Sequence, residues 1–234
     1  MSLTQSTQTN SDLIKTLKLE PHPEGGYFTM GWLGEQKVPT PFVDNAPSRN
    51  LASTIYYLLA PRPSNVVEQD AATLESSELA VSVKSEDGSS KRLKWSPHTA
   101  VFHNNRSATM HLHHAGRAKY TLIEAFPLPG QRPRIKEVVV GTDSERGEVR
   151  QLLVEGGDEG WWKMSEILEE DIPKDSEGDE ALERVGCLIS EVVIPAFDWA
   201  DHQYMRESDL RRLFGDDEAS IARFLPHVGC DEDA

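Results

Sequence analysis

The sequence predicts an all-β protein, a sandwich or a barrel, because of two features. Short runs of apolar, β-branched and aromatic residues recur along most of the chain, and clusters of turn-forming residues separate them. Hydrophobic residues make up 38% of the 234 residues, which suits a packed core in one domain. The predicted strands cover residues 51–59, 100–104, 109–113, 119–125, 135–140, 149–154 and 187–194.

The N-terminal part of the chain carries a helix signal followed by a turn. Residues 1–10 are polar and are predicted to be disordered. Ser11 or Asp12 is the candidate N-cap of a short helix that ends at Leu19. Two prolines and the pair Gly25-Gly26 then break the helix, so we expect the chain to enter a strand there.

Two segments interrupt the predicted strands. Residues 64–99 are rich in Ser, Glu, Asp and Lys, and we interpret them as an inserted surface hairpin that turns at Asp87-Gly88. Residues 165–183 are strongly acidic and predict a solvated loop. The domain is therefore predicted to span residues 11–226, with an acidic tail at residues 227–234.

Two short helices are predicted after the last strand, which is nearly all apolar and stops at Pro195. Ser208 is the candidate N-cap of the first helix, which ends at Gly215. The second helix runs from about Asp217 to Leu225.

Charge and composition limit the classes of partner. The formal net charge is −15, and such a surface repels nucleic-acid phosphates and anionic membranes, so neither is expected as a partner. Neither a secretory leader nor an apolar run long enough for a transmembrane helix is visible. The two cysteines, Cys187 and Cys230, lack a CxxC spacing, which favours a reducing, cytoplasmic location and no structural zinc site.

Four histidines, His103, His111, His113 and His114, form the first candidate site. Neutral imidazole binds transition metals, and residues two apart on a strand point the same way, so His111 and His113 could both enter a barrel. The alternative is that this face lies toward solvent and that His103 only satisfies a buried hydrogen bond. The absence of HEXXH and CxxC patterns favours a protein without a bound metal.

Glu191 is the second candidate, because it interrupts the apolar run Leu188–Ile194. A carboxylate in such a strand is costly unless it is paired or lines a polar cavity. In the functional interpretation, Glu191 is a cavity carboxyl with a raised pKa that binds a ligand or shuttles a proton. In the structural interpretation, it is solvated at an edge or paired with a nearby Arg.

Two further features have both a structural and a functional interpretation. The glycines of Glu24-Gly25-Gly26-Tyr27 permit close backbone approach, although a plain turn into the first strand is favoured. In the pair Trp161-Trp162, neighbouring side chains on a strand face opposite ways, so one indole can form the wall of a pocket for a planar ligand. The alternative for the tryptophans is ordinary core and surface cover.

Five sequence blocks, taken in order, resemble one known family. They are Pro21–Phe28, Ser53–Leu59, Phe102-His103 with His111 and Gly116, Gly147-Glu148 with Gln151 and Gly156-Gly157, and Ser190–Asp201. Together they are similar to the fungal branch of the cupin type 5 family, also described as domain of unknown function 985. The resemblance runs from about Leu13 to Leu225. It implies a cupin (RmlC-like) jelly-roll barrel with short N- and C-terminal helices and a pocket inside, and it does not imply a reaction.

The resemblance also bears on metal binding. Metal-binding cupins carry a His-x-His motif, then a Glu, and a further His in a second motif. Here His103 matches one motif histidine, the Glu position falls near Ala108, and nothing at residues 161–163 replaces the last histidine. We therefore expect no metal and no cofactor, with His111 and His113 as the candidates for a nonstandard site.

The predicted function is a metal-independent, small-molecule-binding cupin whose pocket holds a small polar or planar metabolite. One alternative is an isomerase, epimerase or cyclase that uses His103 and Glu191 as acid and base. Another is a storage or scaffold protein with a vestigial pocket. The predicted ligand-binding residues are Thr54, Tyr56, His103, His111, Gln151, Trp161 and Glu191.

The family resemblance also points to a homodimer. The edge of an open jelly roll is free to pair with another strand. We therefore expect the segment around Phe28 to add a strand to a neighbouring copy.

Overall fold

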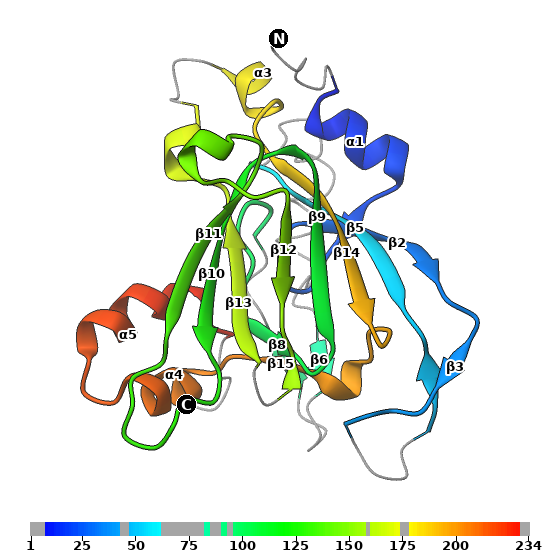
Figure 1. Ribbon diagram of the computed structural model, residues 1–234. Helices are drawn as coiled ribbons and strands as arrows, with labels where there is room; N and C mark the ends of the chain where they lie inside the picture. Colours follow the sequence, from blue (N-terminus) through cyan, green and yellow to red (C-terminus); the bar gives the residue numbers. More distant parts are fainter. Residues whose placement is uncertain are drawn as a thin grey trace.

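The structure is a computed structural model that describes residues 8–42, 47–61, 82–84, 90–92, 96–157, 160–173 and 178–229. It consists mainly of antiparallel strands (Figure 1). The strands are β1 (Glu20–Pro21), β2 (Tyr27–Leu33), β3 (Lys37–Val38), β4 (Arg49–Asn50), β5 (Ser53–Leu59), β6 (Ser82–Lys84), β7 (Ser90–Arg92), β8 (His103–Asn105), β9 (Ala108–Gly116), β10 (Ala118–Glu124), β11 (Ile135–Val140), β12 (Gln151–Val154), β13 (Trp161–Glu166), β14 (Cys187–Ile194) and β15 (His202–Tyr204). The α-helices are α1 (Asn10–Leu17), α3 (Asp179–Leu182), α4 (Glu207–Phe214) and α5 (Glu218–Phe224).

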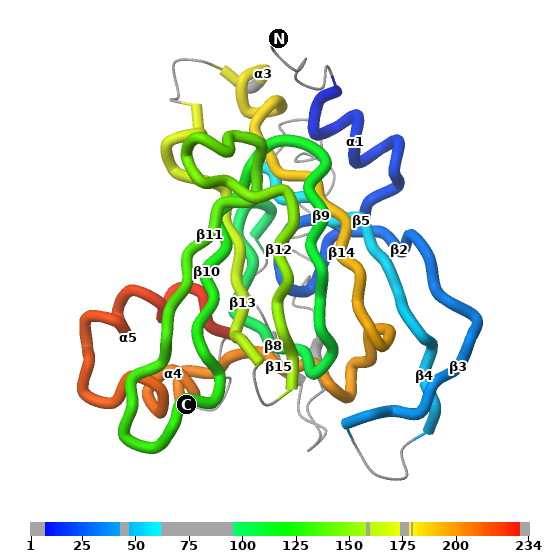
Figure 2. The backbone as a smooth tube through the Cα atoms, viewed as in Figure 1, coloured from blue at the N-terminus to red at the C-terminus, as the bar shows by residue number. Residues whose placement is uncertain are grey.

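Two sheets face each other and form the barrel. The six-stranded sheet has the order β1-β2-β5-β14-β9-β12, and the five-stranded sheet has the order β11-β10-β13-β8-β15. The tube trace shows β9, β12 and β14 side by side, with β10, β11 and β13 to their left (Figure 2). The prediction of an all-β jelly roll with short terminal helices is confirmed.

Side chains from both sheets meet in one core. Tyr57 and Ile189 enter it from the six-stranded sheet, and Tyr120 and Trp161 enter it from the five-stranded sheet. Because side chains alternate along a strand, every second residue of these strands faces the same interior space. A polar residue at one of these inward positions therefore lies inside the barrel, and several such residues form the site described below.

Helix α1 covers the end of the six-stranded sheet, where Leu13, Ile14 and Leu17 pack against a buried cluster of that sheet. The helix begins two or three residues earlier than predicted. Thr9 is its N-cap, because the Thr9 and Asp12 side chains each accept a hydrogen bond from the other's backbone N–H.

Helices α4 and α5 cover the outer face of the five-stranded sheet, where they bury Phe102 and Trp162. Gly215 ends α4 and Asp217 caps α5, as the sequence predicts, whereas α4 starts after Arg206 and Ser208 lies in its first turn. No helix in the described part of the chain is long and apolar enough to cross a membrane.

Two strands of the five-stranded sheet, β13 and β15, are missing from the predicted set. Strand β13 is covered on both faces, by the core inside and by α4 and α5 outside, so its residues show no alternating pattern. Strand β15 has three residues, too few for a pattern. Within the predicted insert, β6 pairs with β7 as the proposed hairpin requires, and most of the insert lies outside the described residues.

Gly116 and Gly147 provide a matched test of the barrel's tight turns. Both have left-handed backbone angles, with φ of +69° and +80°. A methyl group on Gly116 would lie 1.8 Å from the Gly186 carbonyl oxygen, whereas one on Gly147 would meet nothing within 4 Å. We expect Gly147→Ala to cost about 1 kcal/mol from backbone strain. Gly116→Ala should cost a further ~1–3 kcal/mol from overpacking, measured by urea unfolding, and equal costs would contradict the structure.

Candidate functional site

Three charged or polar side chains converge inside the barrel from both sheets. Glu191 on β14 lies directly opposite His111 on β9, and Lys163 on β13 reaches them from the facing sheet. All three are buried, with His111 fully inaccessible to solvent and Lys163 4% exposed. These residues alternate with outward-facing neighbours, which is why the pleat directs them into one space.

The Lys163 ammonium group joins the other two side chains. Its Nζ lies 2.8 Å from His111 Nε2 and 2.9 Å from Glu191 Oε1. His111 Nδ1 lies 3.0 Å from the Leu152 carbonyl oxygen, which can only accept, so Nδ1 carries the proton and Nε2 presents a lone pair. The His111 Nε2 and Glu191 Oε1 atoms, 3.2 Å apart, are thus both acceptors, and Lys163 donates to both.

Charge and burial set the protonation states of this triad. Burial lowers the pKa of His111, and the Lys163 ammonium lowers it further, so the imidazole is neutral. Burial alone would raise the pKa of Glu191, but the charge of the Lys163 ammonium outweighs that effect and holds this pKa well below its usual range. The sequence-based expectation of a raised pKa for Glu191 is therefore not met, because its buried partner is a cation.

A second cluster surrounds Glu24, in the turn before β2. Glu24 Oε2 lies 3.1 Å from His103 Nε2 on β8, and Glu24 Oε1 lies 3.4 Å from His202 Nε2 on β15. His22 Nδ1 is 3.7 Å from the same carboxyl group. The buried ion pair of Arg49 with Asp201 anchors the segment that carries His202.

The proton on Glu24 follows from its surroundings. His103 Nδ1 lies 2.9 Å from the Val101 carbonyl oxygen, so His103 Nε2 is also a lone pair facing Glu24. Two facing acceptors repel unless one is protonated. Burial raises the pKa of Glu24 to about 8 despite the opposing charge of Lys163, so this carboxyl holds its proton at neutral pH. His202 Nε2, 3.4 Å from the other Glu24 oxygen, has no hydrogen-bond partner among the described residues.

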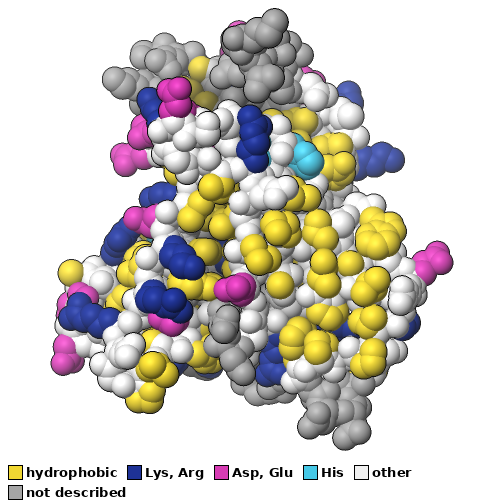
Figure 3. Space-filling model, in the orientation of Figure 1, with side chains coloured by type: hydrophobic (Ala, Val, Ile, Leu, Met, Phe, Trp, Pro, Cys, Tyr) yellow, Lys and Arg dark blue, Asp and Glu magenta, His cyan; other side chains and the backbone are white. Residues whose placement is uncertain are grey.

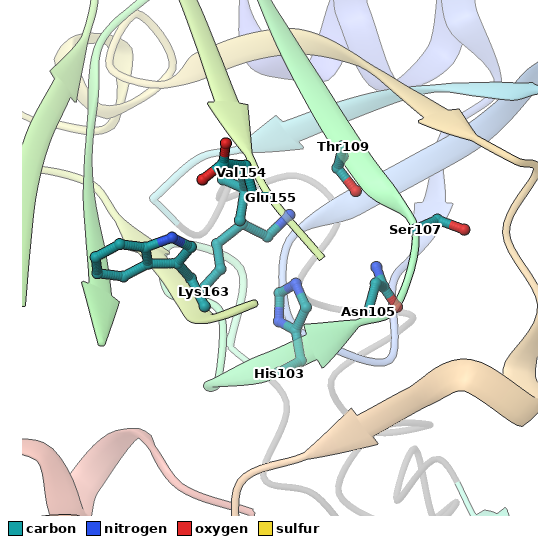
Figure 4. A pocket seen from close by; sticks show the side chains of 8 residues that line it. His103, Asn105, Ser107, Thr109, Val154, Glu155 and Lys163 are labelled. Atoms are coloured by element: carbon teal, nitrogen blue, oxygen red, sulfur yellow. The ribbon is translucent and has the colours of Figure 1, made fainter. Parts of the chain in front are cut away.

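A small cavity adjoins both clusters (Figure 4). Its volume is about 10 Å³, close to the space that one water needs. The buried hydroxyl of Ser107 has no hydrogen-bond partner there. The lining residues are His103, Asn105, Ser107, Thr109, Val154, Glu155, Trp161 and Lys163.

A larger cleft lies outside this cavity, with a volume of about 420 Å³. Glu155 lines both spaces, so the cleft and the cavity adjoin at this residue. The lining residues of the cleft are Pro41, Phe42, Arg106, Ala108, Glu155, Gly156, Ile194 and Pro195.

The structure brings four of the predicted site residues into the interior: His103, His111, Trp161 and Glu191. His111, rather than His103, contacts Glu191, while His103 contacts Glu24.

The other three predicted residues lie on the outer face of the six-stranded sheet. Ile55 and Tyr57 take the inward positions of β5, which turns Thr54 and Tyr56 outward, and the Tyr56 ring packs 5.7 Å from the His114 ring. On β12, Leu152 and Val154 face the core, so Gln151 is exposed. Strands β5 and β12 were predicted, but the inward face chosen for each of them was the wrong one.

Lys163, Glu24 and His202 belong to the site and were not predicted. Lys163 interrupts the buried run Trp161–Ser165 in the way that Glu191 interrupts β14, so the same argument from a lone charge could have identified it. Glu24 was interpreted as part of a structural turn. His202 sits on a three-residue strand that gives no sequence signal.

The structure does not bring His111 and His113 together as the nonstandard metal site considered above. The His111 lone pair that would bind a metal already accepts from the Lys163 ammonium, whose charge repels a divalent cation. His111 and His113 also make separate contacts, because His113 Nε2 lies 2.7 Å from the Gly116 carbonyl oxygen. Across the described ranges, no three His, Cys, Asp or Glu side chains form a group able to hold a metal ion.

The proton on Glu24 predicts an unusual pH dependence of stability. Its folded pKa of about 8 exceeds the ordinary glutamate value of 4.5, so the folded state retains a proton that the unfolded state loses, and stability falls as pH rises between these values. Burial lowers the pKa of His22 to about 4 and of His202 to about 3. These two histidines therefore change the stability only below about pH 6.5, where they make it rise with pH.

From about pH 6.5 to 8, the free energy of unfolding should therefore fall by on the order of 1–2 kcal/mol. Glu24→Gln should abolish this slope, measured by urea unfolding at several pH values. Glu124→Gln is the control, because hydrogen bonds from Arg134 lower the pKa of that exposed carboxyl. A wild-type protein without the slope, or a slope that persists in Glu24→Gln, would refute the assignment.

Comparisons with known proteins agree with the fold. The model of the family described as Cupin superfamily (DUF985) matches residues 11–74 and 92–205. The uncharacterized protein YML079W of Saccharomyces cerevisiae is 30% identical over 229 residues, which cover 91% of this chain and 84% of the yeast protein.

Two solved structures share the architecture. A hypothetical protein from Leishmania major superposes with a TM-score of 0.61 at 24% identity, covering 93% of this chain and 98% of that one. Protein SO0799 from Shewanella oneidensis gives a TM-score of 0.57 at 21% identity with the same coverage. With the family match and the yeast relative, the chain belongs to the Cupin superfamily (DUF985).

Proposed function

We propose that this cupin binds a small polar metabolite in the barrel without a metal, with Lys163 as its charged contact. The observation that carries the proposal is a buried ammonium group held at the cavity wall by His111 and Glu191. An ammonium has three donor hydrogens, and these two partners use two of them. A ligand carboxylate, carbonyl or hydroxyl oxygen is the natural acceptor for the third.

An unsatisfied hydroxyl at the same cavity supports the proposal. Buried polar groups are normally hydrogen-bonded, and each exception calls for an explanation. Ser107 Oγ lines this cavity without a hydrogen-bond partner. A polar ligand or a bound water would satisfy this hydroxyl, which an apolar ligand would not.

The size of the two spaces limits how the ligand binds. The inner cavity holds about one water, whereas the outer cleft of about 420 Å³ is large enough for a small metabolite. We therefore place the body of the ligand in the cleft, beside Phe42 and Arg106, and its polar end past Glu155 at Lys163. The apolar Phe42 and Pro195 in the cleft suit a planar ligand.

A second candidate function, an acid–base enzyme such as an isomerase or epimerase, is favoured by one further observation. Glu24 is held protonated and Glu191 is held ionised inside the same barrel, and such opposed carboxyl groups are typical of acid–base sites. Here Glu24, next to His103, would be the acid. Glu191 would be the base, and because it is paired with Lys163, a proton would reach it by way of the Lys163 amine. Deuterium incorporation into a bound metabolite in D₂O would distinguish this function from simple binding.

The test is native mass spectrometry of the protein purified from its own source. We expect a non-covalent adduct of metabolite mass and no stoichiometric metal, with the metabolite identified after denaturation. Lys163→Met should lose the adduct. Lys119→Met is the matched control, since Lys119 pairs with Glu166 near the surface and lies outside the cavity lining, so it should keep the adduct.

A second variant guards against misfolding of Lys163→Met. Ser107→Ala removes a hydroxyl that has no partner in the structure, so it should leave the melting temperature unchanged and weaken the adduct. An adduct retained by both cavity variants would contradict the proposed site. A wild-type protein without any adduct would favour the storage or scaffold interpretation, and a stoichiometric metal would contradict metal-independent binding.

A further inference from the structure

Side chains of different chemistry follow one another from the inner cavity to the outer cleft. The Lys163 ammonium and the unpartnered Ser107 hydroxyl line the inner cavity, and both can donate hydrogen bonds. The Glu155 carboxylate comes next, because this residue lines both spaces. A ligand that spans both spaces therefore meets donors, then a carboxylate and then a mostly apolar wall. The apolar residues of that wall are Pro41, Phe42, Ala108, Ile194 and Pro195.

The cleft lies at one end of the barrel, where β12 and β14 stop. Glu155 directly follows β12, and Pro195 directly follows β14. Both strands pair antiparallel with β9, so they end at the same edge of the sheet (Figure 1). The surface over these strands is largely hydrophobic, with acidic and basic side chains at its border (Figure 3). An apolar group of a ligand can therefore lie close to charged side chains at this edge.

The two charged residues of the cleft are not paired with each other. Arg106 donates a hydrogen bond to the Phe42 carbonyl oxygen at 3.1 Å, and this contact holds the Phe42 segment at the cleft wall. Within the described ranges, Glu155 makes no hydrogen bond or ion pair with another residue. An unpaired carboxylate where two spaces adjoin favours a ligand that brings a cationic donor of its own.

The charges around the two spaces cancel. Glu191 balances Lys163 in the buried triad, and Arg106 balances Glu155 at the cleft. A ligand with a net charge would add an unbalanced charge to a partly buried site, which carries a desolvation cost. A zwitterion adds no net charge, and each of its charged groups still gains a charge-assisted hydrogen bond. The distribution of charge therefore favours a zwitterionic ligand.

We propose that the ligand is an α-amino acid with an apolar or aromatic side chain. One oxygen of its carboxylate takes the water-sized inner cavity and accepts hydrogen bonds from Lys163 and Ser107. Its α-ammonium group donates to Glu155, and its side chain lies against Phe42 in the cleft. This assignment rests on the proposed function, since it uses the same cavity and cleft, and it adds the chemical class of the ligand.

The covalent structure of an α-amino acid matches the arrangement of these groups. Its carboxylate and ammonium groups are joined through one carbon atom, so the protein groups that bind them must border one small space. Lys163 and Glu155 both line the inner cavity. The side chain leaves from the same carbon atom, and the cleft of about 420 Å³ has room for it. A simple carboxylic acid would instead bring its negative charge beside Glu155 without a compensating cation.

Isothermal titration calorimetry of the full chain tests this ligand class. We expect L-phenylalanine and L-leucine to bind. Two analogues of L-phenylalanine separate its charged groups, because hydrocinnamate lacks the ammonium group and phenethylamine lacks the carboxylate. Each analogue should bind roughly 10- to 100-fold more weakly than L-phenylalanine, since each loses one hydrogen-bonded contact between charged groups.

Glu155→Gln gives a readout specific to the ammonium contact. It should weaken the binding of L-phenylalanine roughly 10- to 100-fold. It should not weaken the binding of hydrocinnamate, because the ligand carboxylate then no longer meets a like charge. Glu155 is exposed, so the variant should fold normally. Glu145→Gln is the matched control, since Glu145 is exposed in the loop between β11 and β12, carries the same charge and lines neither space.

The inference would be overturned if neither amino acid bound at millimolar concentration, or if hydrocinnamate bound as tightly as L-phenylalanine. A folded Glu155→Gln variant that binds L-phenylalanine as the wild type does would also overturn it. A native adduct that Lys163→Met loses, but that has no amino group beside a carboxylate, would overturn this inference and leave the proposed function intact. An adduct retained by both cavity variants would contradict the proposed function itself, and this inference with it.

Discussion

The contact of Lys163 with His111 and Glu191 is the constraint on which the interior of this barrel depends. A buried cation, a buried anion and a neutral imidazole come from three strands of two sheets and meet within 3.2 Å. Each ion alone would carry a large desolvation cost in the core, so each requires the other. The contact also fixes the chemistry of the site, because it uses the His111 lone pair that a metal would bind.

The same constraint separates the two buried carboxyl groups. Glu191, beside Lys163, is ionised, whereas Glu24, among neutral histidines, keeps its proton. The cavity beside these groups is lined by the Lys163 ammonium group and the Ser107 hydroxyl, which suits the proposed recognition of a polar ligand. The unsatisfied Ser107 hydroxyl and the adjoining cleft indicate where such a ligand would enter.

The sequence was sufficient for the fold because the strands have clear periodicity, turn residues separate them, and five blocks resemble one family. It was less informative about the site. The lone charge of Glu191 identified a real interior position, but Thr54, Tyr56 and Gln151 were assigned to the wrong face because alternation defines two faces without saying which one is inside. Glu24 and His202 come from a turn and a three-residue strand, and only the folded chain brings them next to His103.

A double-mutant cycle on Lys163 and Glu191 tests this account most directly. Lys163→Met and Glu191→Leu each leave one buried charge without its partner, so each should lower the free energy of unfolding by about 3–5 kcal/mol. The double variant removes both charges and should be less destabilised than the sum of the two by at least ~2 kcal/mol, measured by urea unfolding. Additivity within ~0.5 kcal/mol would contradict the claim that this contact organises the interior.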